Sequence, residues 1–170
     1  SLLPLPRVGA RLILRELPET VSWLGRGPHE NYPDRKHSAD LGYWCLPRSE
    51  MHTPYIFPSE NGLRCGTRCA QLGDFVVERL DTDLAFSVSE FDIDTLMRAQ
   101  HTNELGAANA LHVHIDGFHM GVGGDDSWSP SVKPPYLLNV REYCWGFKLR
   151  AAAEYLEQLV NRNTATVAAR

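Results

Sequence analysis

The sequence GARLILRELPETVSWLGRG, from Gly9 to Gly27, holds the first two strand-like segments of the chain. Its first part, Gly9–Leu17, alternates apolar and polar residues, which is the pattern of a β-strand with one buried face. Thr20–Gly27 has the same strand-like character and follows a break at Pro18. We therefore predict two strands here, joined to each other as a hairpin.

Similar segments continue along the chain and are separated by turn residues. Between Tyr55 and Leu72, Asn61-Gly62 predicts a second hairpin, because both residues tolerate the positive φ angles of a type I′ turn. The remaining strand-like segments are Asp74–Leu80, Leu84–Phe91, Ala110–Gly124 and Pro135–Ala152. A spacing of about eight to twelve residues, with Gly and Pro at the joints, favours an all-β antiparallel sandwich or barrel.

One segment, Asp92–Leu105, has helical spacing instead. Asp92 or Asp94 could cap its start. The apolar residues expected on its inner side are Ile93, Leu96, Met97 and Leu105. We predict one short helix here, within a β domain that spans residues 1–150. Residues 151–170 become rich in Ala and Glu and should form a tail that is helical or disordered.

The composition of the chain indicates which kinds of partner and which cellular compartment to expect. The 170 residues are 43% hydrophobic, enough for the core of one domain, and the net charge of −4 comes without a basic stripe. We therefore expect neither a nucleic-acid nor a membrane partner. The four cysteines include only one close pair, Cys65 and Cys69, which is too few for a zinc ribbon. Free thiols are typical of the cytoplasm.

Three potential metal ligands, His112, His114 and Asp116, fall at alternate positions and so share one face of a predicted strand. A zinc or iron site is one interpretation. The other is an ordinary strand with one polar face, because apolar residues occupy the positions between them. His119 lies beyond Gly117, which should bend the strand and redirect that side chain. We favour the second interpretation and expect no metal site in this chain.

Two carboxylates, Glu30 and Asp34, occur in WLGRGPHENYPDRK, which spans Trp23 to Lys36. A pair of carboxylates is what glycoside hydrolysis requires, but sequence spacing cannot show that the two groups face each other. A loop this rich in Gly and Pro more often uses its Glu, Asp and Arg side chains to satisfy its own backbone donors and to pair charges. We favour this structural role and assign no catalytic residue to the chain.

The segment HMGVGGDDSWSPSV, His119 to Val132, places Trp128 on a predicted loop beside Asp125 and Asp126. An exposed indole with polar neighbours can bind a sugar, because the apolar face of a pyranose covers the ring while polar groups bind the hydroxyls. The other three tryptophans lie in or beside apolar segments and are expected in the core: Trp23, Trp44 and Trp145.

Three long stretches together carry a resemblance to a known family. They are WLGRGPHENYPDRK, TPYIFPSENGLRCGTR and IDGFHMGVGGDDSWSPSV, and they occur in the same order as in that family. They resemble the C-terminal domain, also called the small-chain or fifth domain, of the large bacterial-type β-galactosidases of glycoside hydrolase family 2. The resemblance covers roughly residues 8–147. It implies an antiparallel β-supersandwich related to galactose mutarotase, of which this chain would form the later half.

The resemblance also implies a function, the hydrolysis of terminal β-D-galactosides such as lactose. In the family the catalytic glutamates and the ligands of magnesium and sodium lie on a separate (β/α)₈ barrel, so this chain is expected to bind no cofactor and to be inactive alone. By motif position, Trp128 would be the platform for the acceptor sugar. Asp125, Asp126 and Ser127 would shape its loop.

Two kinds of partner follow from the resemblance besides the carbohydrate. One is the rest of the β-galactosidase. The other is a second copy of the chain, because the missing half of the supersandwich would leave apolar surface or strand edges uncovered.

An alternative function is a stand-alone carbohydrate-binding or aldose-mutarotase-like domain. A mutarotase needs its own general acid and base facing one pocket, and His119 with Glu60 or Glu30 are the candidates.

Overall fold

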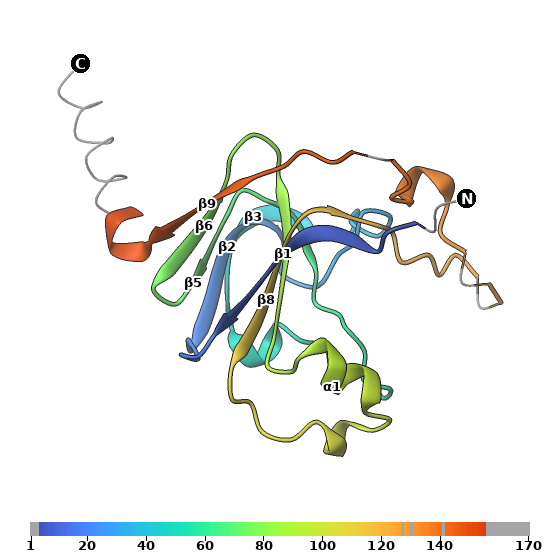
Figure 1. The fold of residues 1–170 in the computed structure, drawn as a ribbon, viewed down its shortest axis with the longest axis horizontal. Helices are drawn as coiled ribbons and strands as arrows, with labels where there is room; N and C mark the ends of the chain where they lie inside the picture. Colours follow the sequence, from blue (N-terminus) through green and yellow to red (C-terminus); the bar gives the residue numbers. More distant parts are fainter. Residues whose placement is uncertain (1–3, 127, 130, 141, 156–170) are drawn as a thin grey trace.

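The computed structural model describes residues 4–126, 128–129, 131–140 and 142–155, and it shows two antiparallel sheets packed face to face (Figure 1). The strands are β1 (Arg7–Leu14), β2 (Thr20–Gly27), β3 (Asp40–Pro47), β4 (Arg64–Thr67), β5 (Cys69–Leu72), β6 (Phe75–Arg79), β7 (Leu84–Ser89), β8 (Leu111–His119) and β9 (Phe147–Ala151). One short α-helix, α1 (Ile93–Arg98), follows β7. Single 3₁₀ turns occupy Arg48–Glu50, Thr102–Glu104 and Pro134–Tyr136. The all-β sandwich expected from the sequence is confirmed.

The first predicted hairpin is wrong. The four-stranded sheet has the order β1-β8-β7-β4 and the five-stranded sheet the order β3-β2-β5-β6-β9, so β1 and β2 lie in different sheets. The chain crosses between the sheets near Pro18. Leu12 of β1 and Trp23 of β2 pack into the same core from opposite sides. Alternation predicts that each strand has a buried face, but it does not say in which sheet that face lies.

The second predicted hairpin, at Asn61-Gly62, is also wrong. Gly62 has the positive φ angle expected of it, +82°, yet residues 55–63 form no strand. The Asn61 side chain is buried and bonds the backbone of Thr53 instead: Oδ1 accepts from the N–H at 2.9 Å, and Nδ2 donates to the carbonyl at 2.8 Å. These side-chain hydrogen bonds stabilise a loop at the position where the sequence predicted the paired strands of a hairpin.

The helix is confirmed but is shorter than predicted. Asp92 caps it, because its Oδ1 accepts from the backbone N–H of Thr95 at 2.6 Å. Leu96 is buried as expected, whereas Met97 is 77% exposed, so Met97 was wrongly placed on the inner face. Ala99 is extended and ends the helix.

The end of the described chain bears on the predicted tail. Strand β9 ends at Ala151, and residues 152–155 are helical. The rest of the predicted tail, residues 156–170, lies outside the described residues. None of the helices in the described residues has the length and hydrophobicity that a membrane span requires.

The core lies between the two sheets. Trp23 is 1% exposed and packs edge to face against Phe86, with ring centroids 5.8 Å apart. Alternate residues of β8, namely Leu111, Val113 and Ile115, fill the centre. Trp44 and Trp145 are half-buried and pack against this core, so all three tryptophans lie where the sequence placed them. The residues that alternate with these three in β8 are polar and lie on the other face of the strand, where they are also buried: His112, His114 and Asp116.

Candidate functional site

The loop that carries Trp128 follows β8 and projects beyond the sheets, at the right of Figure 1. Trp128 is 91% exposed. The Asp126 carboxylate accepts from the backbone N–H groups of Trp128 at 2.8 Å and Ser129 at 2.7 Å, and these bonds hold the pKa of that carboxyl below its usual range. Asp125 pairs with Lys133 at 2.8 Å. Ser127, which was predicted to shape the same loop, lies outside the described residues.

Glu30 and Asp34 each hold a loop, and it is a different loop in each case. Both oxygens of Asp34 accept backbone N–H groups of the Trp128 loop, from Val122 at 3.1 Å and Gly123 at 2.8 Å. Glu30 accepts from the N–H of Gly62 at 2.7 Å and from the hydroxyl of Tyr55. These carboxylates satisfy backbone donors, but the expectation that the donors belong to their own loop is wrong, because they lie in segments distant in sequence.

The segment that carries these two carboxylates is itself fixed to β4. Asn31 is fully buried, and its N–H donates to the carbonyl of Leu63 at 2.7 Å. The Asn31 side chain accepts from the N–H of Cys65 at 3.0 Å. Residues 28–36 therefore connect the body of the four-stranded sheet to the loops held by Glu30 and Asp34.

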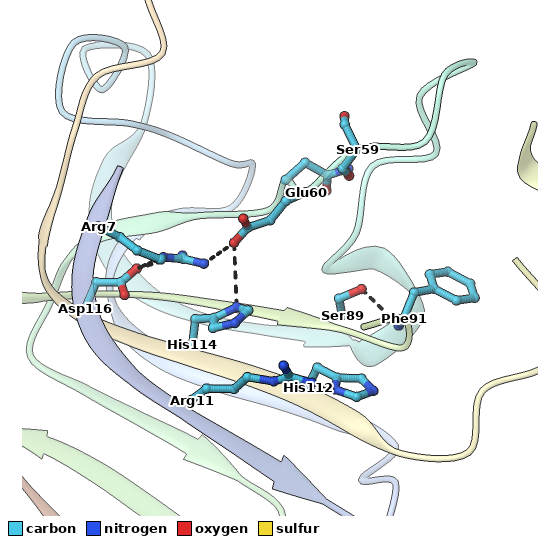
Figure 2. A network of polar contacts seen from close by, with 10 residues as sticks. Arg7, Arg11, Ser59, Glu60, Ser89, Phe91, His112, His114 and Asp116 are labelled. Atoms are coloured by element: carbon cyan, nitrogen blue, oxygen red, sulfur yellow. Dashed lines mark hydrogen bonds and ion pairs between the residues drawn. The ribbon is translucent and has the colours of Figure 1, made fainter. Parts of the chain in front are cut away.

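The outward face of β8 carries a network of charges, shown in Figure 2. Arg7 of β1 lies between two carboxylates. It donates to Oδ2 of Asp116 from Nη2 at 2.7 Å and from Nε at 3.2 Å, and it also pairs with Glu60. His114 lies beside Glu60, with Nδ1 3.6 Å from the carboxylate oxygen. Asp116 is completely buried, and Gly9 leaves room for it, since a Cβ at Gly9 would lie 2.0 Å from Oδ1.

Burial controls the protonation of this face. Desolvation, reinforced by the charge of Arg7, lowers the pKa of His114 to about 4. Burial raises the pKa of Asp116 above its usual value, and Arg7 opposes that shift. His112 has a lowered pKa because of burial and the neighbouring Arg11. At neutral pH the imidazoles of His112 and His114 are uncharged, and Arg7 is the counterion of the buried carboxylate.

The face of β8 is not arranged as a metal site. Among the described residues, no group of three or more His, Cys, Asp or Glu side chains could hold a metal ion. Oδ2 of Asp116 already accepts two hydrogen bonds from Arg7. His119 lies beyond Gly117, and its Nδ1 is 2.7 Å from the carbonyl of Met120. The alternation in β8 thus produces a strand with one polar face.

A cleft of about 450 Å³ is lined by residues of β1, β7 and the end of β8, together with residues of the loops held by Glu30 and Asp34. Its lining includes Tyr32, Glu60 and His119, together with Gly121 and Val122 from the start of the Trp128 loop. His119 and Glu60, one of the two candidate acid and base pairs, therefore share a cleft. Glu30, the alternative partner, is not among the residues that line it.

Comparison with known proteins adds an independent finding. The model of the family described as "Beta galactosidase small chain" matches residues 2–149. The chain is 54% identical over 150 residues to a β-galactosidase of Aeromonas hydrophila, which covers 86% of this chain and 14% of that protein. It is 52% identical to β-galactosidases of Psychromonas ingrahamii and Vibrio cholerae, with 84% and 88% of this chain covered and 14% of each relative. The chain thus spans a small part of the relatives that it matches.

Proposed function

The chain belongs to the β-galactosidase small-chain family, and from this we propose that it is a C-terminal domain of a large β-galactosidase. The complete enzyme, in this proposal, is a glycoside hydrolase of family 2 that hydrolyses terminal β-D-galactosides such as lactose. Support comes from the family match over most of the chain and from relatives named β-galactosidase that are about half identical to it.

The role proposed for this domain is to form the acceptor-sugar wall of the active site. The observation that carries it is Trp128, whose ring is 91% exposed on a loop fixed by Asp126 and Asp34. An indole held in water without a packing partner is a flat apolar surface on which the C–H face of a pyranose can stack. The sugar beyond the scissile bond would rest there.

Bond cleavage is assigned to the rest of the enzyme. Both carboxylates of the rigid loop are occupied by backbone N–H groups, Glu30 by Gly62 and Asp34 by Val122 and Gly123. We therefore place the catalytic carboxylates, and any catalytic magnesium or sodium, outside this chain. The chain alone would not hydrolyse galactosides.

Replacing Trp128 by alanine in the complete β-galactosidase should weaken the binding of a glucose acceptor by about 1–3 kcal/mol, because one stacked ring face is lost. The measurement is the glucose concentration that half-saturates galactosyl transfer to glucose. Phe75→Ala is a control, since Phe75 is also an exposed aromatic residue, 45%, but lies on β6. Equal glucose affinity in the Trp128 variant and the unsubstituted enzyme would remove Trp128 from the site.

The surface of the domain supports the rest of the enzyme as a partner. Ile56 is 92% exposed and Phe57 65%, on the loop braced by Glu30, and β3 is an edge strand that also exposes Leu41. Exposed apolar side chains and free strand edges are usually covered in a native protein. In the complete enzyme we propose that the remaining polypeptide covers them.

Without the remaining polypeptide, the same surfaces should make the isolated chain self-associate. Sedimentation velocity over a range of concentrations would show this as a sedimentation coefficient that rises with concentration. Lysine at Ile56 and Phe57 should shift the equilibrium toward the monomer. A concentration-independent monomer for the unsubstituted chain would contradict this expectation.

We also propose a cytoplasmic location, which is supported by the cysteines. Cys45, Cys65, Cys69 and Cys144 are all free thiols, as in proteins of a reducing compartment.

The mutarotase alternative would depend on His119 and Glu60 in the cleft. Glu60 is already paired with Arg7 and faces His114, so it has less freedom to act as a base. The β-galactosidase domain is the function that we favour.

A further inference from the structure

Among the described residues, the side chain of Asp34 joins the Trp128 loop to a distant part of the sequence. Within the described residues, Asp34 makes the only hydrogen bonds that join residues 122–133 to a remote segment, through the N–H groups of Val122 and Gly123. The other bonds of this stretch are local. They include Asp126 to its own turn and Asp125 to Lys133.

The backbone of the loop lies directly on this carboxylate. A Cβ at Gly121 would be 2.4 Å from Oδ2 of Asp34, so only glycine allows the approach. Gly123 has a φ angle of +68°, and a Cβ there would lie 2.5 Å from the carbonyl oxygen of Ser131. Both glycines are therefore required for the chain to fold back against Asp34 before it reaches Trp128.

Asp34 itself is held in place. It lies in a tight turn in which the N–H of Arg35 donates to the carbonyl of Tyr32 at 2.8 Å, with Pro33 at the second position of the turn. The neighbouring Asn31 is fully buried and bonded to β4. The carboxylate is thus the end of a rigid connection from the four-stranded sheet to the loop.

We propose that Asp34 is a positioning residue for the acceptor sugar: by holding the N–H groups of Val122 and Gly123, it fixes the loop on which Trp128 presents its ring. This inference rests on the function proposed above for Trp128. It assigns to Asp34 no contact with the sugar, so its effect must pass through the loop.

The test substitution is Asp34→Asn in the complete β-galactosidase. An asparagine offers only one acceptor oxygen, so one of the two hydrogen bonds to the loop is lost. Its NH₂ group would face the remaining backbone N–H, and two hydrogen-bond donors would then point at each other. The half-saturating glucose concentration for galactosyl transfer should rise roughly three- to tenfold, with a much smaller change in the rate at saturating glucose. Amide exchange at Val122 and Gly123, followed by mass spectrometry, should accelerate.

Three further variants make the result specific. Asp40→Asn is the matched control, because Asp40 is an exposed carboxylate at the start of β3 remote in sequence from the loop, and it should change neither readout. Gly121→Ala should reproduce the effect of Asp34→Asn without altering any charge. When Trp128 is already replaced by alanine, Asp34→Asn should cause no further rise in the half-saturating glucose concentration, because its effect passes through the Trp128 ring. Unchanged exchange in the β8 peptide confirms that each variant is folded.

The outcomes separate this inference from the proposed function. If Trp128→Ala weakens glucose binding and Asp34→Asn does not, Trp128 keeps its role and the positioning role of Asp34 is overturned. Additive effects in the double variant would overturn it as well, because Asp34 would then act independently of the ring. If Trp128→Ala itself has no effect, the proposed function fails first, and the inference fails with it.

Discussion

Replacing Trp23 by alanine should lower the free energy of unfolding by about 3–5 kcal/mol, the range for deleting a large aromatic side chain from a core. Trp23 is 1% exposed and packs against Phe86. Its Nε1 donates to the carbonyl of Arg26 at 3.0 Å. The guanidinium of the buried Arg64 lies 5.6 Å from the ring centroid, so the substitution also removes the aromatic surface over a desolvated cation. Urea denaturation of the chain measures the change.

Trp128→Ala is the natural control for this experiment. The two side chains are identical, but Trp128 contacts mainly solvent, so its removal should change the free energy of unfolding by no more than about 0.5 kcal/mol. Similar losses of stability in both variants would contradict the division into a core tryptophan and an exposed tryptophan.

That division between tryptophans could be predicted from the sequence, and the reason is local. Trp23 occupies an alternating apolar segment, whereas Trp128 lies among Gly, Asp, Ser and Pro residues, and each context acts over a few residues. Strand positions were predictable on the same basis. Strand partners were not, because β1 pairs with β8, about a hundred residues later, and no local pattern determines that register.

The side-chain hydrogen bonds that hold the loops around the candidate site could not be predicted, for a related reason. Asp34 looked like a carboxylate of its own loop, but its partners are 88 and 89 residues away. Arg64 gave no signal at all, although it is 2% exposed and donates to the carbonyls of Met51, Gly62 and Pro28. Burial lowers its pKa to about 10, still well above neutral pH. Side chains that satisfy distant backbone groups carry no sequence periodicity by which to find them.

Replacing Arg7 by methionine should also cost about 3–5 kcal/mol of the free energy of unfolding near neutral pH, because it leaves the buried carboxylate of Asp116 without its counterion. Asp116 is fully buried, and Arg7 supplies both of the hydrogen bonds that reach Oδ2. Oδ1 has no partner among the described residues. Methionine keeps much of the length and apolar volume of the arginine stem, so the loss reports mainly the unpaired charge.

The pH dependence of this stability loss shows whether the unpaired charge of Asp116 causes it. Burial already raises the pKa of Asp116, and without Arg7 that pKa rises further, so the folded variant holds this proton more tightly than the unfolded chain does. Such a group favours folding below the unfolded pKa and loses that contribution as the pH rises through the folded pKa. Arg7 also lowers the pKa of His114. Without Arg7, protonation of His114 at low pH therefore costs the folded state less free energy. The deficit relative to the unsubstituted chain should therefore be largest near neutrality and shrink toward about pH 4.

Urea denaturation at several pH values measures this deficit, and the double variant Arg7→Met, Asp116→Asn is the control. Removal of the charge should restore much of the lost stability and flatten the pH dependence, because no buried ion then remains to be neutralised. A deficit that is the same at every pH, or that persists in the double variant, would show that Arg7 stabilises the sheet by packing and not as the counterion of Asp116.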